Sequence, residues 1–308
     1  MQSLGQTIFR RFLRALLTLW LVVSVVFVIL HLSGDPVITL LGPDAQPAQV
    51  DALRHELGLD LPLPVQYARY FVALARGDFG LSLHQRQPSL RLVLERFPAT
   101  LQLATAAFAL SIAIGLVVGL LAALLQRSFW DRLSMSIISF LQAGPTFFIG
   151  ILLILFFSVH LGWFPSSGRG TVKQLVLPAV TLAIATTANI SRLTRSTLLD
   201  VLGADYIRTA RAKGLHQRQV VLGHALKNAA LPLVTFLGIE IGGLLTGAVI
   251  TETVFAWPGL GRLAVDAVST RDYPVVQASV LFIAAVFIGI NFLIDCSYTL
   301  LDPRVRGI

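Results

Sequence analysis

One basic segment of the chain, residues 205–232, reads DYIRTARAKGLHQRQVVLGHALKNAALP. Its first part, up to Lys213, favours a short helix, and Gly214 suits the tight turn that ends one. A second helical pattern continues to Asn228, and Pro232 is expected to open the next apolar stretch. The pattern predicts a helix, a glycine turn and a second helix, a shape that can insert into a groove of another protein.

The rest of the chain is apolar enough to lie mostly in lipid. Of its 308 residues, 55% are hydrophobic and 13% are charged, and the mean hydropathy is +0.77, whereas soluble domains carry about 25% charged residues. Six stretches are apolar enough to span a bilayer: Phe12–Leu32, Thr100–Leu125, Ser134–Leu161, Leu175–Leu198, Leu231–Val254 and Val276–Leu301. We therefore predict an all-α membrane protein with six transmembrane helices.

The distribution of basic residues predicts the orientation. With the N-terminus inside, the inner segments hold 14 basic residues against four acidic ones, and the outer segments hold 10 against nine. This bias follows the positive-inside rule and places both termini in the cytoplasm. No cleavage-site pattern follows residue 32, so the first span is expected to be a retained anchor. The single cysteine, Cys296, excludes an internal disulfide and is expected to be a packing residue.

Residues 33–97, between the first two spans, are expected outside the membrane as a helical insertion. Two amphipathic helices are predicted there, Pro47–Leu57 and Pro64–Arg76, with Gly58 and Gly77 as stop signals. Their apolar faces fit either packing on the membrane domain or contact with a soluble partner outside, and the sequence leaves both interpretations open.

Two interpretations also fit the basic segment at residues 205–232. A basic cytoplasmic loop can simply follow the positive-inside rule or bind anionic lipid headgroups. Small residues, Ala210 and Ala212 beside Gly214, favour the close approach of another protein, because lipid binding requires charge but no glycine turn between two helices.

The segment resembles the coupling loop of binding-protein-dependent ATP-binding-cassette (ABC) importer permeases, and the chain resembles their dipeptide/oligopeptide/nickel branch. The family motif begins Glu-Ala-Ala, whereas the equivalent positions here are Arg208-Thr209-Ala210, and the stretch from Gly214 to Pro232 is longer than in sugar importers. Both departures look normal for the peptide branch. Supporting motifs occur in order along nearly the whole chain: Gly34–Pro36, Glu56–Asp60, Gly77–Gly80, Pro98–Leu101, Arg192–Arg195, Thr251–Phe255, Trp257–Gly261, Arg271–Val275 and Asp302–Arg304.

The resemblance implies a type I importer permease fold in the bacterial inner membrane. It divides the chain into an anchor helix (1–32), a periplasmic insertion (33–97), a five-helix core (98–303) with the coupling loop at 199–230, and a short cytoplasmic tail (304–308). It implies four kinds of partner: a second homologous permease subunit, two cytoplasmic ATPase subunits, a periplasmic solute-binding protein and membrane lipid. No nucleic acid is expected.

In this family the coupling loop docks on an ATPase, so the resemblance assigns that role to eight residues: Tyr206, Arg208, Ala210, Arg211, Lys213, Gly214, Leu215 and Arg218. ATP and magnesium would be bound by the ATPase subunits, and no cofactor is expected on this chain. The chain is not expected to be an enzyme, because it lacks a G-x-x-x-x-G-K-[ST] phosphate loop. Residues Gly259–Ala264 fit G-x-G-x-x-A but follow Pro258 outside the membrane, where a tight turn is the better interpretation.

Polar residues within the spans are candidates for the translocation path: Asn189, Glu240, Glu252 and Asn291. Glu240 is nearest to mid-membrane and is expected to face a water-filled path or a partner helix. It is either a selectivity position, a helix contact or a protonated neutral acid. Asp295 is expected to pair with an arginine near the cytoplasmic end.

A stand-alone secondary transporter or channel is the alternative from another class. The chain has no inverted repeat, and only one span, at Gly144-Pro145, is interrupted. An intramembrane enzyme would need a catalytic pair at membrane depth, and none is evident. Peptide is the expected substrate, with glutathione or nickel chelates as alternatives, because an external binding protein usually makes the main selection.

Overall fold

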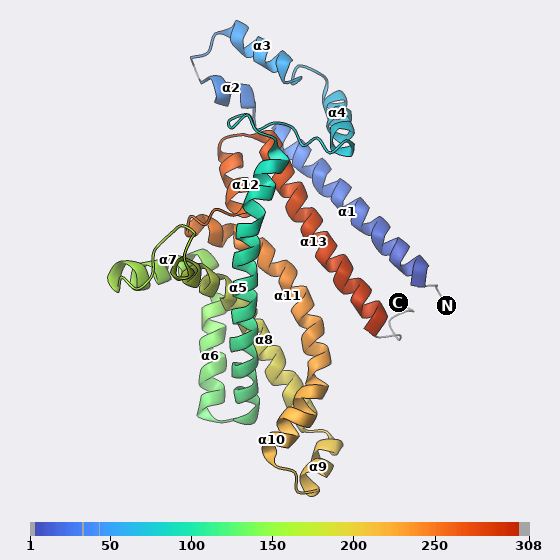
Figure 1. Ribbon diagram of the computed structural model, residues 1–308, viewed down its shortest axis with the longest axis vertical. Coiled ribbons are helices and arrows are strands. Elements are labelled where there is room, and N and C mark those ends of the chain that lie inside the picture. Colours follow the sequence, from blue (N-terminus) through green and yellow to red (C-terminus); the bar gives the residue numbers. More distant parts are fainter. Residues whose placement is uncertain (1–3, 33, 43, 302–308) are drawn as a thin grey trace. The chain divides into compact units, whose positions relative to one another are not determined.

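The computed structural model describes residues 4–32, 34–42 and 44–301, which fold almost entirely into helices (Figure 1). Two segments, η1 and η2, have the wider π-helical winding. An isolated antiparallel bridge between Leu81 and Pro88 is the β pairing found in this part of the chain. The elements are α1 (Leu4–Leu32), α2 (Pro36–Leu41), α3 (Pro47–Glu56), α4 (Leu63–Ala75), α5 (Ser89–Leu124), α6 (Phe129–Ala143), α7 (Thr146–Leu153), η1 (Ile154–His160), α8 (Val172–Leu202), α9 (Asp205–Ala212), α10 (Gln217–Gln219), η2 (Val220–Ala225), α11 (Leu226–Val254), α12 (Leu260–Ser269) and α13 (Tyr273–Leu301).

The chain divides into two compact units. The first contains residues 1–100 and 258–308, and the second contains residues 101–257. The basic segment and most of the candidate path residues lie in the second unit. The predicted division into anchor, insertion, core and tail stays a prediction. The side chains of Asp295 and Cys296 and all of residues 302–308 lie outside the described part of the chain, so the predictions made for them also stay predictions.

The predicted set of spans is confirmed, with one correction. Five helices are long and apolar enough to cross a membrane, and a sixth span results if the bent pair Phe129–Ala143 and Thr146–His160 is counted as one. The continuous helix predicted over Ser134–Leu161 is wrong, because the two halves meet at 104° (Figure 1). Pro145 cannot donate a backbone hydrogen bond and disfavours a helical conformation at Gly144, which is extended.

Helix α5 approaches α8 closely within the second unit. A Cβ atom added at Gly119 would lie 2.6 Å from the carbonyl oxygen of Ser191, and one at Gly115 would lie 2.7 Å from the Ile190 side chain. The two glycines form a Gly-x-x-x-Gly pattern, which lets the backbones of membrane helices approach closely. The spacing of these two glycines is readable in the sequence.

The first unit is organised by α13, which packs along α1, while α12 packs on α13 (Figure 1). Its core gathers buried residues of four helices, among them Leu30, Val93, Leu260 and Val276. The tight turn predicted for Gly259–Ala264 is wrong, because α12 begins at Leu260 and these residues form its start. The apolar side chains of α12 cover that core, which stabilises a helix where the sequence shows two glycines.

The external insertion contains three short helices. The predicted helices Pro47–Leu57 and Pro64–Arg76 are confirmed as α3 and α4. The stop signals Gly58 and Gly77 have φ angles of +68° and +78°, a left-handed conformation that favours glycine. Helix α2 was not predicted; it starts at Pro36, and Asp35 caps it by accepting a hydrogen bond from the Val37 amide.

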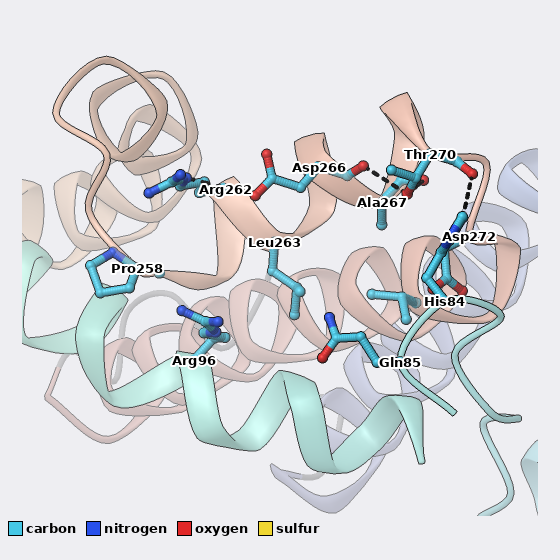
Figure 2. Close-up of a pocket in the computed structure, with 12 residues that line it drawn as sticks. His84, Gln85, Arg96, Pro258, Arg262, Leu263, Asp266, Ala267, Thr270 and Asp272 are labelled. Atoms are coloured by element: carbon cyan, nitrogen blue, oxygen red, sulfur yellow. Dashed lines mark hydrogen bonds and ion pairs between the residues drawn. The ribbon is translucent and has the colours of Figure 1, made fainter. Parts of the chain in front are cut away.

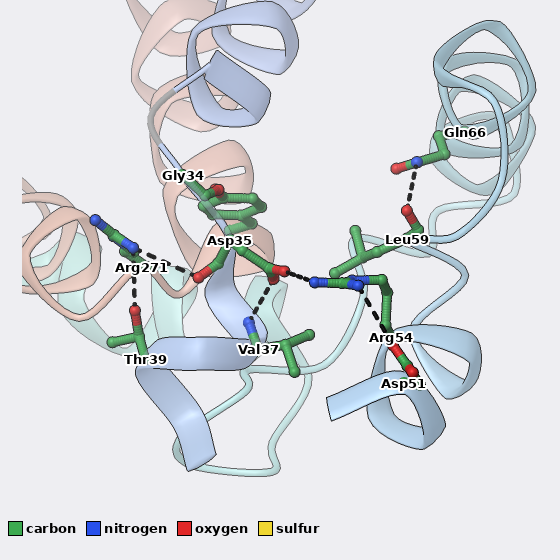
Figure 3. Close-up of polar contacts among 10 residues, drawn as sticks. Gly34, Asp35, Val37, Thr39, Asp51, Arg54, Leu59, Gln66 and Arg271 are labelled. Atoms are coloured by element: carbon green, nitrogen blue, oxygen red, sulfur yellow. Dashed lines mark hydrogen bonds and ion pairs between the residues drawn. The ribbon is translucent and has the colours of Figure 1, made fainter. Parts of the chain in front are cut away.

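Asp35 also connects α2 to its surroundings (Figure 3). Its carboxylate accepts a hydrogen bond from Arg54 of α3 at 2.5 Å, and its carbonyl oxygen accepts one from Arg271 at 3.5 Å. The same Arg271 nitrogen lies 3.4 Å from the Thr39 hydroxyl. The contact with Asp35 raises the pKa of Arg54 above its usual value. These polar contacts fix the insertion where it has few buried apolar side chains.

Helix α4 packs on the first membrane helix. A hydrogen bond of 2.7 Å joins the hydroxyls of Tyr67 and Ser24, and one of 3.0 Å joins His31 to Gln66. Burial raises the pKa of the neighbouring Tyr70, which keeps its phenol neutral. Of the two interpretations that the sequence left open, these contacts favour packing on the membrane domain for the aromatic face of α4.

Candidate functional site

The basic segment forms a short helix that is followed by a glycine turn, as predicted. Helix α9 ends at Ala212, and Gly214 has a φ angle of +81°. The chain then continues helically from Gln217 through α10, η2 and α11 without a break at Pro232. Pro232 begins the apolar span Pro232–Val254, as predicted, but no new helix starts there, because it lies inside α11.

Helix α9 rests on the membrane helices through one apolar face. Ile207 is fully buried and Ala210 is 7% exposed, in a cluster with Ala123, Leu198 and Val220. Ala210 was expected to meet the ATPase, but its burial within the chain gives it another role. It lets α9 lie close against its own unit, so α9 is fixed to α5, α8 and η2 rather than hanging free.

The other face of α9 and the turn after it are exposed (Figure 1 shows α9 and α10 beyond the ends of α8 and α11). Two apolar side chains reach solvent there: Tyr206 is 47% and Leu215 is 37% exposed. The exposed cations of this surface are Arg208, Arg211, Lys213 and Arg218. A rigid surface with two apolar side chains among four cations can enter a groove that has acidic edges.

The turn itself has open space around it. A Cβ atom added at Gly214 meets nothing within 4 Å. Glycine is therefore favoured there by its left-handed backbone and not by crowding within the chain. Seven of the eight residues assigned to docking are exposed together on this surface, and Ala210 is the exception.

A buried ion pair lies between α6 and α8. Arg195 donates hydrogen bonds of 2.7 and 2.8 Å to the two carboxylate oxygens of Asp131. The Asp131 side chain is 4% exposed, and it also accepts from the Arg127 amide. Arg195 belongs to the motif Arg192–Arg195, but its partner is not predictable from the sequence, because 64 positions separate the two residues.

A second polar cluster joins α6, α8 and α11. The Asn189 amide donates to the Glu240 carboxylate at 3.0 Å. The Asn189 carbonyl oxygen accepts from Gln142 at 3.0 Å and from Arg192 at 2.8 Å. Gln142 stands in the last turn of α6, directly before the bend at Gly144. Two of the predicted path residues, Asn189 and Glu240, are thus in contact. Gln142 and Arg192 were not predicted, because they lie on other helices than Glu240 and no periodicity in the sequence links the three positions.

The other two predicted path residues have different surroundings. Glu252 is fully buried inside the second unit, so in this structure it does not line an open path. Asn291 belongs to the first unit, and its amide donates to the Phe287 carbonyl oxygen one turn back on its own helix. Such a local hydrogen bond satisfies a polar side chain in a membrane helix.

The first unit contains a cavity of about 370 Å³ between α12, the start of α5 and the loop at His84 (Figure 2). Figure 2 shows Arg96 and Arg262 near Pro258 at one end of it. Arg262 and Asp266 lie 3.6 Å apart, a long ion pair. The lining contains two arginines, Arg96 and Arg262, and two aspartates, Asp266 and Asp272, so these side chains give the cavity no excess of positive charge. Within the described residues, no cluster of three or more His, Cys, Asp or Glu side chains could hold a metal ion.

Comparisons with known proteins agree with this architecture. Residues 115–307 match the family described as binding-protein-dependent transport system inner membrane component, and residues 4–104 match the family of its N-terminal region. The glutathione transport system permease protein GsiC of Escherichia coli (strain K12) is 42% identical over 300 residues, which cover 97% of this chain and 98% of that protein. The GsiC protein of Salmonella paratyphi A is also 42% identical over the same shares of both chains.

Solved structures show the same fold. An inward-facing conformation of the MetNI methionine ABC transporter has a TM-score of 0.58 at 22% identity and covers 68% of this chain and 96% of that chain. An amino acid ABC transporter with histidines has a TM-score of 0.52 at 20% identity and covers 68% and 94%. Together with the family match, this shows the type I importer permease fold predicted from the sequence.

The family model spans more than half of the chain, and the curated relatives match it over nearly their full length. ATP hydrolysis in this family takes place on separate ATPase chains, and the family works with a second permease and a solute-binding protein. The chain belongs to the binding-protein-dependent transport system inner membrane components and is the non-catalytic, multi-pass permease subunit of an ABC importer of the bacterial inner membrane.

Proposed function

We propose that this permease forms half of the translocation pathway for small peptides and that α9 with its glycine turn is the place where a cytoplasmic ATPase subunit docks. The exposed basic face of α9, held on the membrane helices by Ile207 and Ala210, carries this proposal. The importer would contain two ATPase subunits and a second homologous permease, and a periplasmic binding protein would deliver the solute. Both termini and α9 would lie on the cytoplasmic side.

The packing of α9 supports a mechanical role. Its buried face shares one apolar cluster with residues of α5, α8, η2 and α11, among them Ala123, Leu198, Val220 and Leu233. A displacement of α9 by the ATPase is therefore passed to the ends of the membrane helices instead of being absorbed by a loose loop. Such partner binding biases the balance between inward-facing and outward-facing states.

Peptide substrates follow from the branch that the sequence resembles. The relatives at 42% identity are named as glutathione transport permeases, and glutathione is itself a small peptide, so it is the second candidate. We therefore place glutathione and dipeptides together as solutes with a free ammonium group and free carboxylates.

Uptake by the assembled importer tests this function. The four kinds of protein chain are reconstituted in liposomes, and labelled dipeptide or glutathione is supplied with the binding protein, with and without ATP inside. We expect accumulation only with ATP and with the ATPase subunits. ATP-independent uptake by the permease alone would instead identify a secondary transporter or channel.

Substitution of Gly214 by arginine tests the docking role. The chain has open space around Gly214, so a long side chain would project toward the partner rather than into the permease. We expect Gly214→Arg to insert normally in the membrane and to abolish stimulated ATP hydrolysis. Normal stimulated ATPase activity from this variant would contradict the proposal.

A further inference from the structure

Glu240 is an acidic residue inside a membrane helix, and its place in α11 is well defined. It follows Pro232, where the apolar span begins, by about eight residues, which is roughly 12 Å along a helix axis. An ionised carboxylate at this depth is costly unless it faces a partner or water. Its surroundings therefore indicate what it interacts with.

The protein satisfies only part of this carboxylate. One oxygen of Glu240 accepts a hydrogen bond from the Asn189 amide at 3.0 Å. Within the described part of the chain, no arginine, lysine or histidine forms an ion pair with it. Arg192 donates to the far side of the Asn189 amide, at 2.8 Å. The carboxylate is thus oriented by an amide but is not neutralised, and it is half-buried rather than sealed in the core.

The helix bend beside this cluster also points to a binding site. Gln142, which holds Asn189, is in the last turn of α6 before the 104° bend. Membrane proteins tolerate broken helices at membrane depth where they are buried in protein or line a water-filled cavity, and transporters often bind solutes at such places. Helices α6, α8 and α11 therefore place two side-chain amides, one carboxylate and one guanidinium group next to the bend between α6 and α7.

We propose that Glu240 binds the protonated amino group of the transported solute while Asn189 orients the carboxylate. This inference rests on the proposed function, because it assigns part of the selectivity for small peptides to the permease itself. Arg192 contacts Asn189 and not Glu240, so an ammonium group can supply the ion-pair partner that Glu240 lacks within the described chain and can donate to the second carboxylate oxygen. Arg192 makes the cluster neutral as a whole, so a zwitterionic solute is not repelled.

A purely structural role predicts different behaviour. If Glu240 only connected α11 to α8, glutamine would serve as well, because its carbonyl oxygen can accept the same hydrogen bond from Asn189. Glu240→Gln therefore separates charge from packing. Glu240→Asp keeps the charge on a shorter side chain and serves as the rescue variant.

Uptake by the assembled importer in liposomes provides the test, with alanyl-alanine, glutathione and N-acetyl-alanyl-alanine as probes. We expect Glu240→Gln to lower the uptake of the two probes with a free amino group about tenfold, the loss of one charged hydrogen bond. Glu240→Asp should recover part of the rate. ATP hydrolysis stimulated by the loaded binding protein should stay within about twofold of the wild type. Glu95→Gln, which removes an exposed acid from the external part of α5, is the control for lost negative charge.

The outcomes distinguish the two proposals. Wild-type uptake of the free-amino probes together with unchanged uptake by Glu240→Gln would overturn the ammonium site and leave the importer function intact. Equal wild-type uptake of N-acetyl-alanyl-alanine, once the binding protein is shown to bind it, would also overturn the site. If the wild-type importer moves neither alanyl-alanine nor glutathione, the proposed substrate class fails and this inference fails with it.

Discussion

Arg195 of α8 holds Asp131 of α6 through two hydrogen bonds, of 2.7 and 2.8 Å, across 64 positions of sequence. Asp131 lies in the first turn of α6, and Arg195 lies two turns before the end of α8, from which the chain enters α9. The pair therefore fixes the start of the bent span to the helix that leads to the docking surface. Breaking this ion pair should therefore weaken the packing of α6 against α8 and the attachment of the docking surface.

Removal of Arg195 is expected to destabilise the permease. Arg195→Met leaves Asp131 as a buried carboxylate that keeps its Arg127 amide contact but loses its ion pair, which costs about 3 kcal/mol. Thermal unfolding in detergent measures the change. The double variant Asp131→Leu with Arg195→Met should recover much of the loss, because no uncompensated charge remains. A single variant as stable as the wild type would show that the pair is not needed.

The glycines of α5 give a second prediction. Gly119→Ala places a methyl group 2.6 Å from the Ser191 carbonyl oxygen, so α5 must move away from α8. We expect a loss of about 2 kcal/mol, as for other overpacked sites. Gly243→Ala in α11 is the matched control, because a Cβ atom there meets nothing within 4 Å. Equal unfolding temperatures for both variants would contradict the close approach of α5 and α8.

The turn after α9 depends on backbone conformation, which gives a third prediction. Gly214→Val forces a β-branched residue into a left-handed conformation and should shift the turn, whereas Gly214→Asn should preserve it, because asparagine adopts this conformation readily. ATP-driven uptake should fall strongly for the valine variant and only slightly for the asparagine variant. Gly223→Ala, at another glycine with open space around it, should leave uptake unchanged. Similar rates for the valine and asparagine variants would mean that the left-handed turn is not required.

The external insertion should respond to acid. The hydrogen bond from His55, 2.7 Å from the carboxylate, lowers the pKa of Asp60 below its usual value. A carboxyl group with a lowered folded-state pKa adds stability above its unfolded pKa, about 3.9, and loses it as the pH falls through the folded value. Amide protection in residues 54–63, taken as the exchange rate relative to the intrinsic rate at each pH, should therefore decrease as the pH falls below about 4. Asp60→Asn should remove that pH dependence, and an unchanged acid response in this variant would rule out Asp60 as its cause.

Much of the fold was predictable because lipid leaves the sequence few alternatives. Long apolar stretches must be helices in a membrane, and glycines at 58, 77 and 214 mark helix ends through their left-handed conformation. The bend at Gly144 was marked by the following proline, but its angle of 104° depends on what α7 packs against, which no local pattern encodes. Whether a proline bends or ends a helix also depends on packing, and Pro232 is accommodated within α11.

The residues of the docking surface were predictable from the sequence, whereas the contacts between side chains on different helices were not. Charge and small residues located the docking segment, but the burial of Ala210 depends on Ala123 and Leu198, far away in sequence. Glu240 was identified as a polar residue at membrane depth, whereas its partner Asn189 and the supporting Gln142 required the packing of three helices. Pairings across many positions leave no periodic signal in one sequence.

Docking of the ATPase on the turn after α9 is the central claim, and site-specific photo-crosslinking tests it most directly. A photoreactive amino acid replaces Leu215, an exposed residue of the turn, in the assembled importer, and Trp130, which is 65% exposed beside the turn between α5 and α6, is the control position. The account predicts a crosslink from position 215 to the ATPase subunit and little or none from position 130. An assembled, active importer that gives no crosslink to the ATPase from position 215 would contradict it.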